Sequence, residues 1–283
     1  MSESRVRPRV GFVGAGRVGK GLSLALARCG YPVIGVAGRS GSPSAQEIVD
    51  QAQIVFLTLP DDVIADVTAR LNWRPDIAAV HCSGAADLSV LASAARQGAA
   101  IGGFHPLQMF ADPAVAADGL SRCAIAVEAE EPLAATLVAI VAELGARALR
   151  VPAGARAAYH AGAHYAGPFV AALLAEALEV WGRIGIDADD ALAALVPLLR
   201  GSVDAIEHSG LANGMAGSVA RGDVQTVARH LDALAALDPS LRDFYCRLAL
   251  RSIPLALAAG KLEPGRAGEL RAQLTQGIRG GSP

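Results

Sequence analysis

The chain has 283 residues, 52% of them hydrophobic, so it is long enough for two domains and can bury a large core. Its 25 Lys and Arg residues nearly balance 27 Asp and Glu residues, without the basic excess typical of nucleic-acid-binding proteins. No uncharged apolar run reaches the roughly 18 residues that a membrane span requires. We therefore expect neither nucleic acid nor a membrane as a partner.

The four cysteines are scattered along the chain and form no C-x-x-C pair. This spacing predicts reduced thiols in the cytoplasm and, because the possible ligands are not clustered, no metal site. The amino-terminal segment lacks the apolar stretch and cleavage site of a secretion signal, which agrees with a cytoplasmic location.

Short β-rich runs alternate with helical patterns over residues 1–151. Helices are expected at 18–29 and 132–144, and continuous apolar strands between helices predict a parallel sheet covered on both faces. The expected strands are 10–13, 33–37, 54–59, 77–81, 100–104, 123–127 and 147–151.

Only helical patterns follow over residues 152–283. A long helix is expected at about 153–184, disturbed at Gly167–Pro168, and Asp187, Asp223 and Asp238 are expected to cap later helices. The predicted fold is thus an α/β Rossmann domain over 1–151, followed by an all-α domain over 152–283 for substrate binding and dimerisation.

The first strand leads into Gly14-Ala15-Gly16-Arg17-Val18-Gly19, a G-x-G-x-x-G motif at the start of a helix. In this context each glycine has its own role, since Gly14 permits the turn, Gly16 admits the pyrophosphate, and Gly19 lets the helix pack on the strand. The motif predicts a dinucleotide site on the helix amino terminus.

The second strand ends in Gly38-Arg39-Ser40, where NAD enzymes place a carboxylate for the ribose. A guanidinium and a hydroxyl suit a 2′-phosphate instead, so we expect NADP rather than NAD. The end of the third strand, Leu59-Pro60, is expected to flank the cofactor, and Asp61 and Asp62 to cap the next helix.

Several blocks together resemble Rossmann-like proteins with a carboxyl-terminal DUF2520 domain. They are 81–85 (HCSGA), 103–110 (GFHPLQMF), 215–223 (MAGSVARGD) and 227–231 (VARHL). The resemblance implies kinship with 6-phosphogluconate dehydrogenase-like and pyrroline-5-carboxylate reductase-like enzymes. These join a Rossmann domain to a helical, often dimer-forming domain, and some DUF2520 proteins resemble a ketopantoate reductase. This chain has Gly167-Pro168 where the family commonly has Ser-Asn, so the family's substrate is not transferred.

His105 and Ser83 are the expected catalytic residues, because each follows a strand at the sheet edge where ligands bind. Their layout resembles prephenate dehydrogenases, which implies that His105 polarises the substrate oxygen and relays a proton while Ser83 assists. A turn-capping role for His105 stays open. Residues considered for substrate contact are His81, Gln108, His160, His164 and Arg221.

We expect an NADP-dependent oxidoreductase acting on a small polar carbonyl or alcohol, such as a keto or hydroxy acid, held in a cleft between the domains. The apolar helical domain is expected to form a homodimer. Two alternatives stay open: an imine reductase of the pyrroline-5-carboxylate type, and a non-catalytic NADP-binding sensor.

Overall fold

The computed structural model describes residues 7–279, so part of the amino-terminal segment expected to lack a secretion signal lies outside the described residues. Within it the chain divides into two compact units, 1–167 and 168–283. The expected boundary at 151/152 marks the change from strands to helices, whereas the first compact unit continues through one more helix.

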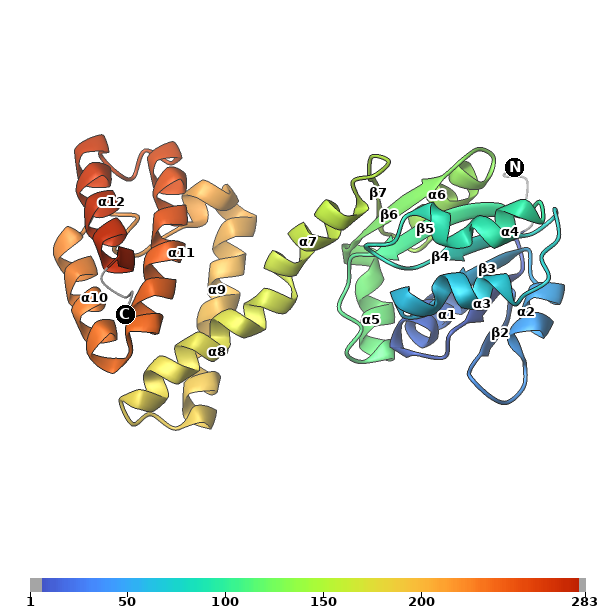
Figure 1. Ribbon diagram of the computed structural model, residues 1–283, viewed down its shortest axis with the longest axis horizontal. Helices are drawn as coiled ribbons and strands as arrows, with labels where there is room; N and C mark the ends of the chain where they lie inside the picture. Colours follow the sequence, from blue (N-terminus) through green and yellow to red (C-terminus); the bar gives the residue numbers. More distant parts are fainter. Residues whose placement is uncertain (1–6, 280–283) are drawn as a thin grey trace. The chain divides into compact units, whose positions relative to one another are not determined.

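The first unit is built on a seven-stranded sheet with strand order β2-β1-β3-β4-β5-β6-β7 (Figure 1). The expected Rossmann fold is confirmed. The strands are β1 (Val10–Val13), β2 (Val33–Ala37), β3 (Ile54–Leu57), β4 (Ala78–His81), β5 (Ala100–Pro106), β6 (Ala124–Ala129) and β7 (Arg147–Arg150).

Helices cover both faces of this sheet because alternate residues of its apolar strands point to opposite sides. On one face Phe12, Phe56 and Phe104 form a row of contacting rings under α1, α5 and α6. The other face packs against α2, α3 and α4. The helices of this unit are α1 (Arg17–Arg28), α2 (Ala45–Gln51), α3 (Ile64–Ala69), α4 (Ala92–Arg96), α5 (Pro113–Gly119), α6 (Leu133–Glu143) and α7 (Arg156–Ala166), with short 3-10 turns η1 (Asp61–Val63), η2 (Leu88–Leu91) and η3 (Leu120–Arg122).

The expectation of an all-parallel sheet was wrong for one pair, because β5 and β6 are antiparallel. After β5 the chain forms α5 beside α1 and starts β6 at the edge where β5 ended, as the Leu107 amide bond to the Ala124 carbonyl shows (2.8 Å). A parallel β6 would need a connection that returned across the whole sheet. Pairing with β6 also extends β5 to Pro106, two residues beyond its expected end.

The second unit contains only helices among its described residues: α8 (Pro168–Arg183), α9 (Ala188–Gly214), α10 (Val224–Leu237), α11 (Pro239–Ala258) and α12 (Pro264–Arg279). The expected long helix is divided at Gly167 into α7 and α8. Asp187, Asp223 and Asp238 accept backbone N–H bonds as the predicted amino-terminal caps. The core of this unit joins α10, α11 and α12.

Candidate active site

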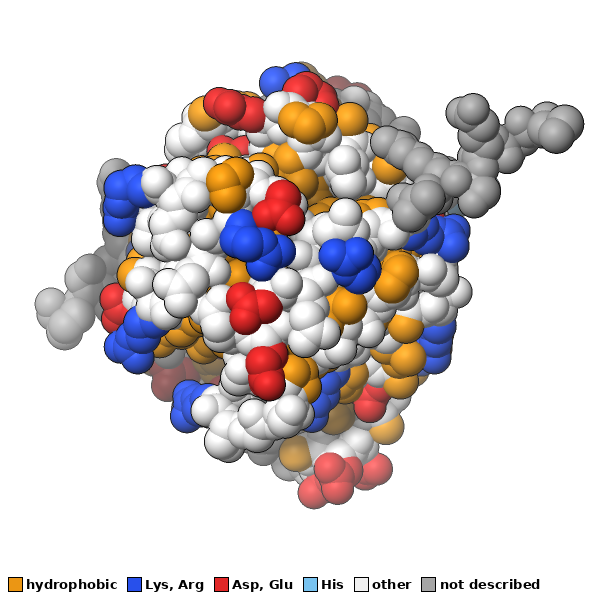
Figure 2. All heavy atoms as spheres, turned by 90° about the vertical axis from the view of Figure 1, so that its right-hand side faces the viewer, with side chains coloured by type: hydrophobic (Ala, Val, Ile, Leu, Met, Phe, Trp, Pro, Cys, Tyr) orange, Lys and Arg blue, Asp and Glu red, His pale blue; other side chains and the backbone are white. Residues whose placement is uncertain are grey.

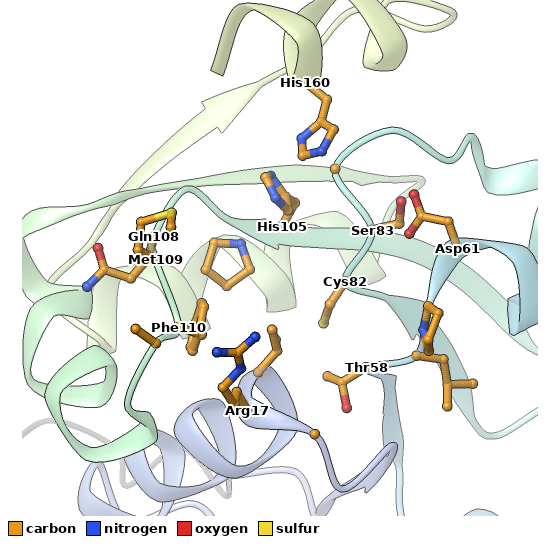
Figure 3. Close-up of a pocket in the computed structure, with 17 residues that line it drawn as sticks. Arg17, Thr58, Asp61, Cys82, Ser83, His105, Gln108, Met109, Phe110 and His160 are labelled. Carbon is orange, nitrogen blue, oxygen red and sulfur yellow. The ribbon is translucent and has the colours of Figure 1, made fainter. Parts of the chain in front are cut away.

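A cavity of about 520 Å³ opens at the carboxyl edge of the sheet, where ligands bind in Rossmann folds (Figure 3). The loops after β1, β3, β4 and β5 and one side chain of α7 line it. The lining residues are Gly16, Arg17, Val18, Thr58, Leu59, Pro60, Asp61, Cys82, Ser83, Gly84, His105, Pro106, Gln108, Met109, Phe110, Ala111 and His160. All of them belong to the first compact unit.

The loop between β1 and α1 has the geometry that its glycines predict. Gly14 has a φ of +121°, and a Cβ there would lie 2.3 Å from the Thr58 carbonyl oxygen. A Cβ on Gly19 would lie 2.1 Å from the Gly14 carbonyl oxygen, so the helix can approach the strand only without it. A Cβ added at Gly16 would have no neighbouring atom from other parts of the described chain within 4 Å, and no side chain caps α1. The loop thus leaves free space at the helix amino terminus, where an anion is stabilised.

Two neighbouring strand ends hold this loop in place. The Thr58 hydroxyl, just after β3, donates to the Gly14 carbonyl (2.8 Å), and the Gly14 amide donates to the Ala37 carbonyl at the end of β2 (2.9 Å). Ala15 lies against the position of Gly38. Arg39 and Ser40 follow Gly38 directly and are exposed.

Leu59 and Pro60 line the cavity next to the glycine loop, as expected for residues that flank a cofactor. The expected capping role of Asp61 and Asp62 was wrong, because Pro60 occupies the cap position of η1 and no side chain caps it. Both aspartates lie in the first turn, and Asp61 lines the cavity. The proline ring before them fixes where this turn begins.

Ser83 follows β4, and its hydroxyl oxygen accepts hydrogen bonds from the amides of Ala85 and Ala86 (3.1 and 2.9 Å). Because both acceptor positions are engaged, the hydroxyl proton is what Ser83 can offer to a molecule in the cavity. Ser83 is therefore equipped to donate a hydrogen bond and not to accept one.

His105 lies inside β5, where it is paired with Ala126, and not directly after the strand as expected. Burial, with smaller effects from His160 and Arg156, lowers the pKa of His105 to about 4. The imidazole is therefore neutral near pH 7. Its Nδ1 lies 3.0 Å from the hydroxyl of Tyr159.

His160 reaches the same cavity from α7, and Figure 3 shows its ring above that of His105. The two ring centres are 5.4 Å apart and the rings are nearly perpendicular. Gly84 makes this approach possible, because a Cβ there would lie 2.3 Å from His160 Nδ1 and 2.9 Å from His105 Cε1. Burial lowers the pKa of His160 as well.

Arg156 is a fully buried residue that sequence reasoning did not identify. Its Nε donates to Glu128 of β6 (2.5 Å) and its Nη1 to the Ser83 carbonyl (2.9 Å), so it joins α7 to two parts of the sheet. The guanidinium passes over Gly103, where a Cβ would lie 2.2 Å from Nη2. Its signal in the sequence is the spacing of Arg156, Tyr159 and His160, which puts all three on one helix face.

His81 is fully buried at the end of β4 and is not among the residues that line the cavity. Neither nitrogen of the His81 ring has a hydrogen-bond partner in the structure. Its Cε1, like Nη2 of Arg156, lies close to the place where a Cβ on Gly103 would be. Burial, with a smaller effect from Arg156, lowers the pKa of His81 to about 3. The residue is therefore a neutral core imidazole under the site.

The three other residues expected to contact the substrate, Gln108, His164 and Arg221, lie in different parts of the structure. Gln108 lines the cavity, although its amide nitrogen also lies over Gly119. His164 lies one turn beyond His160, and its Nδ1 donates to the His160 carbonyl (2.9 Å). Arg221 is exposed and belongs to the second compact unit.

Within residues 7–279, no group of three or more His, Cys, Asp or Glu side chains is arranged to hold a metal ion. None of the helices described there has the length and apolar character needed to cross a membrane. On the face shown in Figure 2, acidic and basic side chains are interspersed and neither sign forms a continuous patch.

Comparison with known proteins gives two matching family models. A Rossmann-like domain matches residues 2–106, and a domain of unknown function, DUF2520, matches residues 123–252. No curated protein matches the chain.

Three solved structures share the fold. A candidate NADP oxidoreductase from Bacteroides fragilis is 21% identical, with a TM-score of 0.68 over 88% of this chain and 98% of that one. A Thermotoga maritima protein is also 21% identical, with a TM-score of 0.71 over 88% and 98%. A 1-pyrroline-5-carboxylate reductase from Streptococcus pyogenes is 12% identical, with a TM-score of 0.59 over 94% and 99%.

The sheet, its glycine loop and the first family model place the chain in the Rossmann-like class. The second model then identifies it as a protein with a DUF2520 domain, which confirms the predicted resemblance. The DUF2520 match begins at the edge of β6 and includes α7, so it covers Arg156, Tyr159 and His160 as well as much of the helical unit.

Proposed function

We propose that this protein is an NADP-dependent oxidoreductase that transfers hydride between NADPH and a small polar carbonyl or alcohol, such as a keto or hydroxy acid. The observation that carries the proposal is the convergence of the glycine loop, Ser83 and His105 on one cavity. A nucleotide site and two side chains able to bind a substrate oxygen are what such a reaction requires.

The residues present fit a dinucleotide. The open space at Gly16 and the uncapped start of α1 suit the pyrophosphate, and Leu59 and Pro60 would flank the ribose and nicotinamide. Arg17 begins α1 and lines the cavity, so its guanidinium adds positive charge there. A bound nicotinamide would supply the hydride.

NADP is favoured over NAD by the loop after β2. Its exposed Arg39 and Ser40 follow Gly38, which lies against Ala15 of the glycine loop, and they offer donors to a 2′-phosphate, with no carboxylate to repel it. The name of the Bacteroides fragilis structure points to the same cofactor.

His105 and Ser83 are the proposed catalytic residues. A neutral imidazole N–H and the Ser83 hydroxyl would both donate to the substrate oxygen and stabilise the negative charge that develops on it as hydride arrives. His160 and Gln108 line the same cavity and are proposed to contact the rest of the substrate.

The test is a screen of NADPH oxidation against keto acids, aldehydes and imines, followed by His105→Ala with the best substrate. We expect the variant to lose about 100-fold or more in turnover, because it lacks a donor to the reacting oxygen, and to bind NADPH normally. Near-normal turnover would contradict the role of His105. Tight NADPH binding without oxidation by any substrate would favour a sensor.

Imine reduction is the second candidate, and the lowered pKa of His105 favours it. A neutral imidazole is a weak acid, whereas reduction of an already protonated imine needs a hydride and no further proton. The name of the Streptococcus pyogenes structure is in keeping with this chemistry. Preferential turnover of cyclic imines over keto acids in the same screen would support it.

We further propose a cytoplasmic homodimer formed through the helical unit. All four cysteines are free, as expected in a reducing compartment. Helix α8 has no buried residue among those described, and exposed Leu198, Val203 and Leu211 lie along α9. These apolar side chains suit a second copy of the same unit.

A further inference from the structure

Tyr159 is a polar contact of His105 that sequence reasoning did not identify. The hydroxyl lies 3.0 Å from Nδ1, and the two rings meet edge to face with centres 5.7 Å apart. Tyr159 is half-buried on α7, and Arg156 in the first turn of that helix is anchored to Glu128 and the Ser83 carbonyl. The contact is therefore part of a fixed arrangement.

This hydrogen bond determines which ring nitrogen of His105 carries the proton. A neutral imidazole has one N–H donor and one acceptor nitrogen, whereas a phenol is an acidic donor and a poor acceptor. The favoured arrangement has the Tyr159 hydroxyl donating to Nδ1. The proton of the imidazole then resides on Nε2, the nitrogen left for a molecule in the cavity.

We propose that Tyr159 is a positioning residue that holds His105 in its Nε2–H form and resupplies its proton during the reaction. The proposal rests on the function proposed above. It assigns the donor facing the substrate to His105 Nε2 and the proton reserve to the Tyr159 hydroxyl.

The step balances for reduction of a carbonyl by NADPH. Hydride from the reduced nicotinamide forms the new C–H bond, and the π electron pair of the C=O bond moves to oxygen. That oxygen takes the Nε2 proton of His105 while the phenol proton moves to Nδ1. Nδ1 then returns its proton to the phenolate while Nε2 takes a proton from water entering the cavity, which restores the Tyr159 hydroxyl and the Nε2–H form of His105. The reverse sequence serves alcohol oxidation.

The titratable and charged groups around the pair do not replace this route. They are Arg156 and His160 on α7, His81 at the end of β4 and Cys123 before β6. Arg156 is a permanent cation, His81 is neutral and fully buried, and burial raises the pKa of the Cys123 thiol. His160 contacts the His105 ring edge to face.

The first test measures the tautomer by nitrogen NMR on protein labelled in its histidine rings, and it requires no substrate. For His105 we expect a protonated Nε2 and an unprotonated Nδ1 near neutral pH. In Tyr159→Phe the Nδ1 signal should move and the other tautomer should become populated. Tyr165→Phe, on the same helix, should leave the His105 signals unchanged. A protonated Nδ1 in the natural protein, or no change in Tyr159→Phe, would overturn the proposal.

The second test measures turnover of the substrate found in the NADPH screen. Tyr159→Phe should reduce kcat about tenfold or more with unchanged NADPH affinity, because the proton reserve is lost while the nucleotide site is intact. Unchanged kcat would overturn the resupply of the proton. If the natural protein reduces no substrate, the proposed function fails and the proton transfer with it, whereas the tautomer is still decided by NMR.

Discussion

Single residues in this site take their chemistry from burial. His105 and His81 are the same residue type in adjacent strands, yet one lines the cavity and bonds to Tyr159 while the other is enclosed with both nitrogens unpaired. Burial lowers both pKa values, to about 4 and about 3. Contact with the cavity is therefore what separates the catalytic candidate from the core residue.

Arg39→Asp tests the cofactor preference at one residue. The substitution replaces a donor with a carboxylate that repels a 2′-phosphate and accepts hydrogen bonds from ribose hydroxyls, so NADPH affinity should fall about tenfold or more. The affinity of this variant for NADH should equal or exceed that of the natural protein. Titration of both cofactors by fluorescence measures the effect, with Arg96→Asp at the exposed end of α4 as a matched charge change. Equal affinities in the natural protein would contradict the preference.

His81 predicts a dependence of stability on pH. The unfolded chain takes up a proton on this imidazole near pH 6.5, whereas the folded chain does not until about pH 3, so the free energy of unfolding falls as the pH falls below 6.5. At pH 5 the loss from His81 is about 2 kcal/mol. Denaturant unfolding from pH 7 to pH 5 should show a smaller decline in His81→Leu than in the natural protein, with exposed His208→Leu as the control. Parallel declines in all three proteins would refute the assignment.

At the scale of elements, α7 completes the site. Its first residue, Arg156, is fixed to β6 and to the loop after β4, and the next turn presents Tyr159 and His160 over β5. Gly103 and Gly84 provide the space for this helix, because a Cβ at either position would lie within 2.3 Å of one of its side chains. The carboxyl edge of the sheet is thus covered by side chains from later in the chain.

Arg156→Met tests the anchor of α7. The change leaves Glu128 without its partner and the Ser83 carbonyl without a donor, so the first unit should lose on the order of 3 kcal/mol of stability. Calorimetry measures this loss of stability, because it can resolve the unfolding transition of the first unit from that of the second. The exposed Arg150→Met should change stability by less than about 0.5 kcal/mol. A similar small effect for Arg156→Met would mean that α7 is held by other contacts.

At the scale of the molecule, the helical unit is unevenly packed. Helices α10 to α12 share a buried core, whereas α9 buries only Ala191 and Leu195 among its described residues. Alongside it runs an apolar cavity of about 750 Å³ lined in part by Leu198, Ile206 and Leu211. Such a surface is what a homodimer of this unit would bury.

Leu198→Glu tests the proposed dimer, because Leu198 is 66% exposed and a charge there would be desolvated in an interface. The natural protein should sediment as a dimer and the variant should dissociate at least tenfold more readily. Val115→Glu, at a residue 70% exposed in the first unit, should remain dimeric. A monomeric natural protein would contradict the proposal.

The sequence by itself determined the class of fold and the conformation of the glycine loop, because both depend on local rules. Apolar strands alternating with helices specify the sheet, and glycines at Gly14, Gly16 and Gly19 are required by the backbone conformation of one turn. The end of β4 and the caps at Asp187 and Asp223 also follow from short-range patterns.

Only the tertiary structure decided which side chains gather at the candidate site. The antiparallel β6 extends β5 through His105, and α7 brings Arg156, Tyr159 and His160 to residues more than 50 positions earlier in the chain. Helical spacing puts those three side chains on one face but does not specify what that face packs against. Contacts between distant segments depend on packing and burial in three dimensions, which also lower the pKa values of His81, His105 and His160.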